Sequence, residues 1–311
     1  MLKKDLLGLY NLDCPRIETI LEKASFYKRN FKGSFSILKG KTVAILFFEP
    51  STRTRLSFEL AIKRLGGEVL NFNTELSSVL KGESLVDTVQ SIEALGVDGF
   101  IIRHGFSGAV EMLAGRVDKP VINAGDGAHE HPTQALLDLL TLKEAKGSIA
   151  GLRVLMVGDI THSRVVRSSI YGLKAAGAKV RLIGPPTLLP QKIEYLGVET
   201  GSNLDEALPE ADVVYLLRIQ LERQRSGLFP SMEEYSQFFG LTKKRLQLLK
   251  PGTIVMHPGP VNVGAEITAE ALAALEDGLP GGTTTFIKRQ VTNGVVVRMA
   301  ILDLLLGGKG Q

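Results

Sequence analysis

Residues 42–67, TVAILFFEPSTRTRLSFELAIKRLGG, contain the pattern that decides the fold class. The apolar run at 42–48 predicts a buried β-strand, and from about Thr52 the residues favour a helix until Gly66 and Gly67 end it. A buried strand that leads directly into a helix is the repeating unit of α/β proteins with a parallel sheet. We therefore expect an α/β fold.

The same strand-helix unit recurs along the chain. Its repetition predicts doubly wound parallel sheets joined by long helices, and no internal repeat or low-complexity tract stands out. Further strands are expected at 99–103, 121–125, 153–159, 180–184, 212–218 and 253–259, helices at 132–146 and from about Asn293, and mobile loops at 73–83 and 219–240.

Chain length indicates two domains. The 311 residues exceed the length, about 250–300 residues, at which a single hydrophobic core usually stops growing. The segment KGSIAGL at 146–152 separates two strand-helix series, so we expect the helix before it to join the domains. With 44% hydrophobic and 23% charged residues, the composition is that of a globular protein and excludes extensive disorder.

Charge and cysteine content narrow the class of function. The 37 Lys and Arg exceed the 33 Asp and Glu by only four and form no long basic block, which suits small anionic substrates better than nucleic acid. Cys14 is the only cysteine, so a reducing, cytoplasmic location is expected. No run of 18 apolar residues predicts a membrane span, and polar residues interrupt any signal peptide at the start of the sequence.

The turn after the first strand has the chemistry of a phosphate site. Ser51 is the expected N-cap of the helix that follows, and the first helical N–H groups bind anions. Thr52 and Thr54 add hydroxyl donors, while the guanidinium of Arg53 can bind two phosphate oxygens at once. An ordinary capped helix with solvated arginines is the alternative, and Arg55 is expected to point away from such a ligand.

Two further segments end strands with polar side chains. His131 and Gln134 lie in HPTQ, where a strand leads into a helix, and Arg103 ends the strand-like GFIIR. Taken singly, each has a structural alternative, namely a buried or exposed histidine and a solvated arginine. Donors fixed around a carbonyl oxygen would stabilise the negative charge that develops when a nucleophile attacks its carbon.

These motifs carry a resemblance to a known family. The run from Ser51 to Arg55, followed by Ser57-Phe58-Glu59, resembles the carbamoyl phosphate motif of the aspartate and ornithine carbamoyltransferases. Similar segments follow in family order at SVLKGESLVDT, IIRH, HPTQALLDL, GDITHSR, LLRIQLER, HPGPVN and QVTNGVVVRMAIL, so the resemblance covers nearly the whole chain.

The resemblance implies a first set of site residues. They would bind carbamoyl phosphate, with five of them also acting in catalysis by positioning and charge stabilisation, without covalent catalysis, metal or organic cofactor. The catalytic set is Arg53, Thr54, Arg103, His131 and Gln134; the binding set adds Ser51 and Thr52, together with Ser77 and Lys81 from a neighbouring subunit of a homotrimer with shared active sites.

A second set would select L-aspartate as the acceptor. Two arginines are natural receptors for its two carboxylates, although RIQLERQR could also be a charged loop or helix face. The implied residues are Arg164, Arg218, Gln220, Lys81, Gly259 and Pro260, with a cis Gly259-Pro260 bond and a Glu49–Arg223 contact on domain closure. Family members often have Arg where this chain has Val263, which leaves the role of that position open.

The resemblance also gives an expected organisation. Residues 1–136 would bind carbamoyl phosphate, 137–284 would bind L-aspartate, and 285–311 would form a helix returning to the first domain, with the active site in the crevice between domains and subunits. The product would be N-carbamoyl-L-aspartate for de novo pyrimidine biosynthesis. A regulatory chain or a dihydroorotase stays open as a partner.

Three rival functions are weaker. Ornithine carbamoyltransferases resemble this chain but have cysteines in HPCQ and HCLP segments, where this chain has HPTQ and HPGP, and its Arg-x-Gln favours an anionic acceptor. A dinucleotide-binding oxidoreductase would need Gly-x-Gly-x-x-Gly after a strand, but only Gly158 is present. A homologue that binds anions without catalysis would not need so complete a set of site residues.

Overall fold

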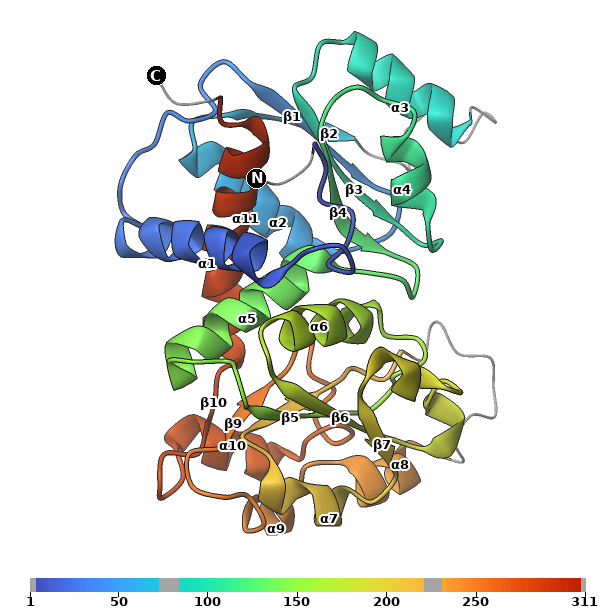
Figure 1. Cartoon of the computed structure of the whole chain (residues 1–311), viewed down its shortest axis with the longest axis vertical. Helices are drawn as coiled ribbons and strands as arrows, with labels where there is room; N and C mark the ends of the chain where they lie inside the picture. The colour runs from blue at the N-terminus through green and yellow to red at the C-terminus, as the bar shows by residue number, and fades with distance from the viewer. Residues whose placement is uncertain (1–3, 73–83, 221–230, 309–311) are drawn as a thin grey trace. The chain divides into compact units, whose positions relative to one another are not determined.

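The computed structural model of the protein describes residues 4–72, 84–220 and 231–308, which divide into two compact units. The first unit contains Met1–Leu140, Arg167–Gly172 and Thr292–Gln311, and the second contains Thr141–Val166 and Leu173–Val291. Three helices, α5 (Pro132–Lys146), α6 (Arg164–Ala175) and α11 (Ile287–Leu306), contribute residues to both (Figure 1).

The first unit is built on a four-stranded parallel sheet in the order β2-β1-β3-β4. The chain passes from β1 outward to β2 and then returns beyond β1 to β3, so the winding direction reverses between β1 and β3. Ligands of open α/β sheets bind at the carboxyl ends of strands beside such a switch point. The elements are α1 (Cys14–Arg29), β1 (Thr42–Phe47), α2 (Thr52–Arg64), β2 (Glu68–Phe72), α3 (Leu85–Ala94), β3 (Gly99–His104), α4 (Ala109–Ala114) and β4 (Val121–Asp126).

The second unit has a six-stranded parallel sheet in the order β10-β9-β8-β5-β6-β7. Its winding direction reverses between β5 and β8. Its strands are β5 (Arg153–Val157), β6 (Lys179–Ile183), β7 (Glu199–Gly201), β8 (Val213–Leu216), β9 (Ile254–Met256) and β10 (Thr284–Thr285). Its helices are α7 (Leu204–Ala207), α8 (Met232–Phe239), α9 (Lys243–Leu246) and α10 (Ala269–Asp277), with 3₁₀ turns η3 (Pro186–Leu188), η4 (Ile193–Leu196) and η5 (Leu208–Glu210).

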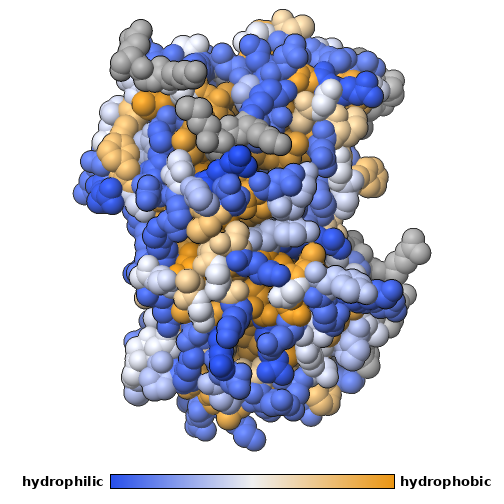
Figure 2. All heavy atoms as spheres, viewed as in Figure 1, coloured by the Kyte–Doolittle hydropathy of each residue, from blue (hydrophilic) through white to orange (hydrophobic). Residues whose placement is uncertain are grey.

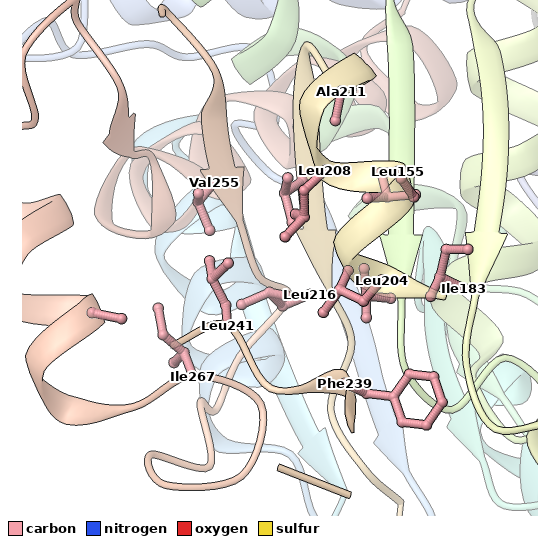
Figure 3. Close-up of a cluster of buried hydrophobic side chains, with 14 of the residues drawn as sticks. Leu155, Ile183, Leu204, Leu208, Ala211, Leu216, Phe239, Leu241, Val255 and Ile267 are labelled. Carbon is pink, nitrogen blue, oxygen red and sulfur yellow. The ribbon is translucent and has the colours of Figure 1, made fainter. Parts of the chain in front are cut away.

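Each sheet has its own apolar core. In the second unit, Leu155 and Leu216 of adjacent central strands pack with Leu204, Leu208 and Phe239 from the covering helices and turn (Figure 3). In the first unit, apolar residues of β1, β3 and β4 pack with those of α3 and α4. Each fully buried leucine contributes roughly 1.5–3 kcal/mol, so these clusters hold the strand ends, and the loops that follow them, in place.

The edge of β4 is covered by the N-terminal segment. Leu6 pairs in parallel with Ile122, and its N–H donates to the Val121 carbonyl at 2.9 Å. The Asp5 carboxylate accepts the Val121 N–H at 2.8 Å. An otherwise open strand edge is thereby paired, which also brings the chain start beside the segment that leads to His131.

The strands and helices confirm most of the sequence predictions. All seven predicted strands occur, and α5 has the predicted bounds. The expectation of a loop through 219–240 was wrong for α8, whose N-cap Ser231 accepts the Glu234 N–H at 3.1 Å. The last helix begins at Ile287, before the predicted Asn293, because the Thr285 hydroxyl accepts the Ile287 N–H at 3.4 Å and helical bonding starts there.

Hydrophilic residues predominate on the face shown in Figure 2, with smaller hydrophobic areas between them. Among the helices of the described chain, none is long and apolar enough to cross a membrane.

Candidate functional site

The N-terminus of α2 has an arrangement suited to anions. Ser51 is the N-cap in an extended conformation, but its hydroxyl makes no capping hydrogen bond, and the first turn contains no acidic residue. Thr52 and Arg53 are exposed, whereas Thr54 is buried. Arg55 forms an ion pair with Glu59 at 2.9 Å, one turn along the helix. The helix start thus presents hydroxyls, N–H groups and one arginine, while Arg55 is engaged elsewhere.

Arg103 lies across the switch point from this helix start. It pairs in register with Phe47 at the end of β1, and the β3–β4 register shifts between Ile102 and His104. Such irregularities re-aim the side chain at that position. Its Nε lies 2.7 Å from Glu49 Oε1, and its Nη1 donates to the Ala124 carbonyl at 3.1 Å. Two anchors on neighbouring segments therefore fix the guanidinium before any ligand binds.

The backbone of His131 is held by a buried relay. Its N–H donates to the Ser168 hydroxyl at 2.8 Å, and that hydroxyl donates to the Glu130 carboxylate at 2.6 Å. Glu130 also accepts the Leu9 N–H at 2.8 Å. Burial raises the pKa of the Glu130 carboxyl, while the hydrogen bonds from Ser168, Leu9 and Tyr10 oppose that shift. Three segments distant in sequence therefore meet immediately before α5.

Asp126 shapes the turn that carries the chain from β4 to His131. This buried carboxylate accepts the Gly108 N–H at 2.7 Å, the Asn123 amide at 2.9 Å and the Glu130 N–H at 3.1 Å. These N–H groups take the place of water around the buried carboxylate, and their hydrogen bonds hold the turn in one conformation.

The side chains of the HPTQ segment are supported from α5 and α11. Gln134 donates to Asp138 at 3.2 Å, and the Thr133 hydroxyl lies 3.5 Å from His131 Nδ1. Arg298 donates to the Thr133 hydroxyl at 3.3 Å. Burial lowers the pKa of Arg298, and the positive charge of Arg103 acts in the same direction. This second cation adds to the positive field at the segment that carries His131.

In the second unit, Arg164 and Arg218 follow the two strands that flank the switch point. β5 and β8 are neighbours, with Val157 paired to Leu216, and both residues lie beyond their carboxyl ends. Arg164 begins α6 and is 3% exposed, whereas Arg218 and Gln220 are partly buried. This is the position at which open α/β sheets bind ligands.

The turn at Gly259-Pro260 follows β9, the next strand along. The peptide bond is cis, as expected, and Gly259 has a φ of 65°, where glycine is favoured. The Gly259 N–H donates to His257 Nδ1 at 2.7 Å. Because Met256 pairs with Tyr215, this turn follows the strand next to the one that carries Arg218. Val263 is 53% exposed.

Other expected features lie elsewhere. Ser77, Lys81 and Arg223 are outside the described residues, so their roles stay predictions. Among the residues that are described, no group of His, Cys, Asp and Glu could hold a metal ion.

A pocket of about 140 Å³ lies at the amino ends of β5, β6 and β7. Both basic and acidic residues line it, including Arg153, Lys179, Glu199 and Glu210. It is at the opposite ends of the strands from Arg164 and Arg218.

Comparison with known proteins assigns the family. Residues 4–144 match the aspartate/ornithine carbamoyltransferase carbamoyl-P binding domain, and residues 150–305 match the Asp/Orn binding domain of the same family. The chain belongs to the aspartate/ornithine carbamoyltransferase family. It is 52% identical over 310 residues to the aspartate carbamoyltransferase catalytic subunit of Moorella thermoacetica (98% of each chain), and 51% identical over 308 residues to that of Halothermothrix orenii (98% of this chain, 96% of the relative).

Solved structures of carbamoyltransferases have the same two-sheet fold. Aspartate transcarbamoylase from Trypanosoma cruzi with N-(phosphonacetyl)-L-aspartic acid has a TM-score of 0.85 at 33% identity, covering 96% of this chain and 94% of that one. Ornithine carbamoyltransferase from Thermus thermophilus also has a TM-score of 0.85, at 30% identity, covering 98% and 100%. The fold alone therefore does not show whether aspartate or ornithine is the acceptor of the carbamoyl group.

Sequence reasoning missed several residues of this carbamoyltransferase that support the predicted site. Glu130, Ser168 and Arg298 hold the segment of His131, and Glu266 contacts the segments of Arg218 and Gly259. Two of them had a signal in the sequence: Glu130 is a charged residue directly before the HPTQ motif, and Arg298 lies in the segment QVTNGVVVRMAIL.

Proposed function

We propose that this protein transfers the carbamoyl group of carbamoyl phosphate to the α-amino group of L-aspartate. The products are N-carbamoyl-L-aspartate and phosphate, in de novo pyrimidine biosynthesis. The observation that carries this proposal is the position of three arginines beside the two switch points: Arg103 lies near the carboxyl end of β3, and Arg164 and Arg218 follow the carboxyl ends of β5 and β8. The close sequence relatives, which are aspartate carbamoyltransferase catalytic subunits, support the choice of acceptor.

The first unit would bind carbamoyl phosphate. The α2 N-terminus with Ser51, Thr52, Arg53 and Thr54 would bind the phosphate, because N–H groups, hydroxyls and an arginine occur together at the start of this helix. Arg103, Thr54, His131 and Gln134 would orient the carbamoyl group and stabilise the charge on its oxygen. Their buried supports favour this role, since preorganised donors need no rearrangement during reaction.

The chemistry then needs no covalent intermediate. The aspartate amine attacks the carbonyl carbon, a C–N bond forms, and the C–O bond to phosphate breaks. The amine's proton leaves with the phosphate, which can accept it. The contribution of the protein is to hold both reactants in place and to stabilise the developing negative charge.

The second unit would select the acceptor by charge. L-Aspartate has two carboxylates, and Arg164 and Arg218 supply two permanently charged guanidinium groups. Gln220, Gly259 and Pro260 would complete the acceptor site, together with Lys81. Ornithine has a cationic side chain, which two arginines would repel.

Assembly and location are also part of the proposal. Ser77 and Lys81 would enter the site of a neighbouring subunit, so activity would need a homotrimer. Glu49 would pair with Arg223 when the domains close. The single cysteine favours a cytoplasmic location. Light scattering should give three times the chain mass of 33.7 kDa.

The test is product formation. Purified protein with carbamoyl phosphate and L-aspartate should release phosphate and N-carbamoyl-L-aspartate in equal amounts. Phosphate release without carbamoylated product would show hydrolysis instead, and neither product would show a protein that only binds anions.

A further inference from the structure

A buried carboxylate, Glu266, lies between the two segments of the second unit that carry the proposed acceptor residues. Glu266 is 1% exposed and follows the Gly259-Pro260 turn in the chain. It is 47 residues away from Ile219, the residue between Arg218 and Gln220, yet its carboxylate accepts the Ile219 N–H at 2.8 Å. One side chain therefore contacts the segment of Arg218 directly.

The same carboxylate also fixes the turn after β9. It accepts the Asn262 backbone N–H at 2.7 Å and the Asn262 side-chain amide at 2.8 Å. His257 Nε2 lies 3.1 Å from it, in a pair whose side chains are 0% and 1% exposed. Because His257 Nδ1 accepts the Gly259 N–H, the ring proton of neutral histidine is on Nε2 and is donated to Glu266.

Four donors thus converge on one carboxylate. Ile219 and the Asn262 side chain bond Oε1, while the Asn262 backbone and His257 bond Oε2. An ionised carboxylate accepts about four hydrogen bonds and donates none, so the group matches these donors. Losing it would leave buried N–H groups without acceptors, which costs more than the net value of each bond.

We propose that Glu266 is a positioning residue for the acceptor site. Its carboxylate fixes the segment with Arg218 and Gln220 relative to the turn with Gly259 and Pro260, and thereby sets the affinity for L-aspartate. This rests on the proposed function, in which those four residues bind the acceptor. Glu266 itself touches backbone groups, Asn262 and His257, and is assigned no contact with substrate.

The direct test is Glu266→Gln, which keeps the shape but replaces one oxygen with NH₂. In either orientation the amide NH₂ group faces two N–H donors, so the hydrogen bonds that join the Ile219 segment to the turn after β9 are partly lost. We expect the KM for L-aspartate to rise at least about tenfold, with the KM for carbamoyl phosphate within about twofold. Equal changes in both KM values would overturn the proposal.

Thr253→Val is the matched control for general destabilisation. Thr253 is buried at the opposite end of β9, where its hydroxyl lies 3.0 and 2.8 Å from the carbonyls of Ala211 and Lys250. At a similar loss of thermal stability, its KM for L-aspartate should stay near the wild-type value. If both variants raise it equally, Glu266 has only a structural role.

A milder variant and a second readout complete the experiment. Asn262→Ala removes one donor and should raise the KM for L-aspartate in the same direction, which decides the matter if Glu266→Gln does not fold. Hydrogen exchange should show lost protection at Ile219 and Gly259 in Glu266→Gln but not in Thr253→Val. If the wild type carbamoylates no aspartate, the proposed function fails. Unchanged protection at the Ile219 and Gly259 amides in Glu266→Gln would separately overturn the positioning role of Glu266.

Discussion

The backbone N–H of His131 donates a hydrogen bond of 2.8 Å to the hydroxyl of Ser168, a residue 37 positions later in the chain. Ser168 in turn donates to Glu130 at 2.6 Å. The carbonyl-facing histidine of the proposed mechanism is therefore placed by a helix that begins after the fifth strand. The effect of this support on His131 can therefore be tested by mutating Ser168 and leaving His131 unchanged.

Ser168→Ala should lower both activity and stability. The variant leaves the His131 N–H without its acceptor and removes one of the donors to Glu130, so the free energy of unfolding should fall by about 1–3 kcal/mol. We expect kcat to fall about tenfold because His131 is less well placed. Ser169→Ala is the control, since Ser169 is also buried but its hydroxyl has no hydrogen-bond partner among the described residues. Equal kcat values for the two variants would contradict the relay.

His131→Ala should reduce turnover much more than binding. Loss of one donor to a developing oxyanion typically lowers kcat by about 10²–10³-fold. Affinity for phosphate, measured by calorimetry, should change little because the α2 N-terminus is intact. A kcat within a few-fold of wild type would remove His131 from the mechanism.

Arg53 and Arg55 form a matched pair on one helix turn. Arg53→Ala should raise the KM for carbamoyl phosphate about 10–100-fold, the loss expected for hydrogen bonds to a charged group. Arg55→Ala should leave it nearly unchanged, because Arg55 pairs with Glu59 and its side chain is 48% exposed. Steady-state kinetics decides, and the reverse order of effects would show that the phosphate lies on the other face of the helix.

Glu130 predicts a specific pH dependence of stability. Burial raises the pKa of its carboxyl above the ordinary 4.5, so the folded protein binds this proton more tightly than the unfolded chain does. The contribution of Glu130 to the free energy of unfolding is therefore greatest below pH 4.5 and is lost as pH rises through the pKa of this carboxyl in the folded protein. Relative to Glu130→Gln, the wild type should lose free energy of unfolding as pH rises from 4.5, then run parallel above the folded pKa. Urea titrations across that range test this; parallel curves throughout would contradict it.

Much of the fold was predictable because parallel strands covered by helices are continuous apolar runs. TVAILF and RVLMV became β1 and β5, and the helix 132–146 was found with its observed bounds. The edge strands Glu68–Phe72, Glu199–Gly201 and Thr284–Thr285 were missed, the last two because two or three mostly polar residues have no strand pattern. The helix after Ser231 was also missed, although Ser-Met-Glu-Glu is a capping sequence.

The site residues could be predicted from the sequence only where they lie together in one contiguous motif. Ser51–Thr54 and His131–Gln134 lie in such motifs, and the structure places both in one unit at the ends of strands. Glu130–Ser168 and Ile219–Glu266 are contacts across 38 and 47 positions. Buried hydrogen bonds between such distant residues depend on sheet order and loop path, which no local periodicity encodes.

The most direct test of the account is carbamoyl transfer from carbamoyl phosphate with L-aspartate and L-ornithine assayed in parallel. The two-arginine acceptor site predicts that kcat/KM for L-aspartate exceeds that for L-ornithine by at least about 10⁴-fold, as expected when a wrong substrate leaves buried charges unpaired. A preference for L-ornithine would contradict the roles of Arg164 and Arg218, even with the phosphate site intact.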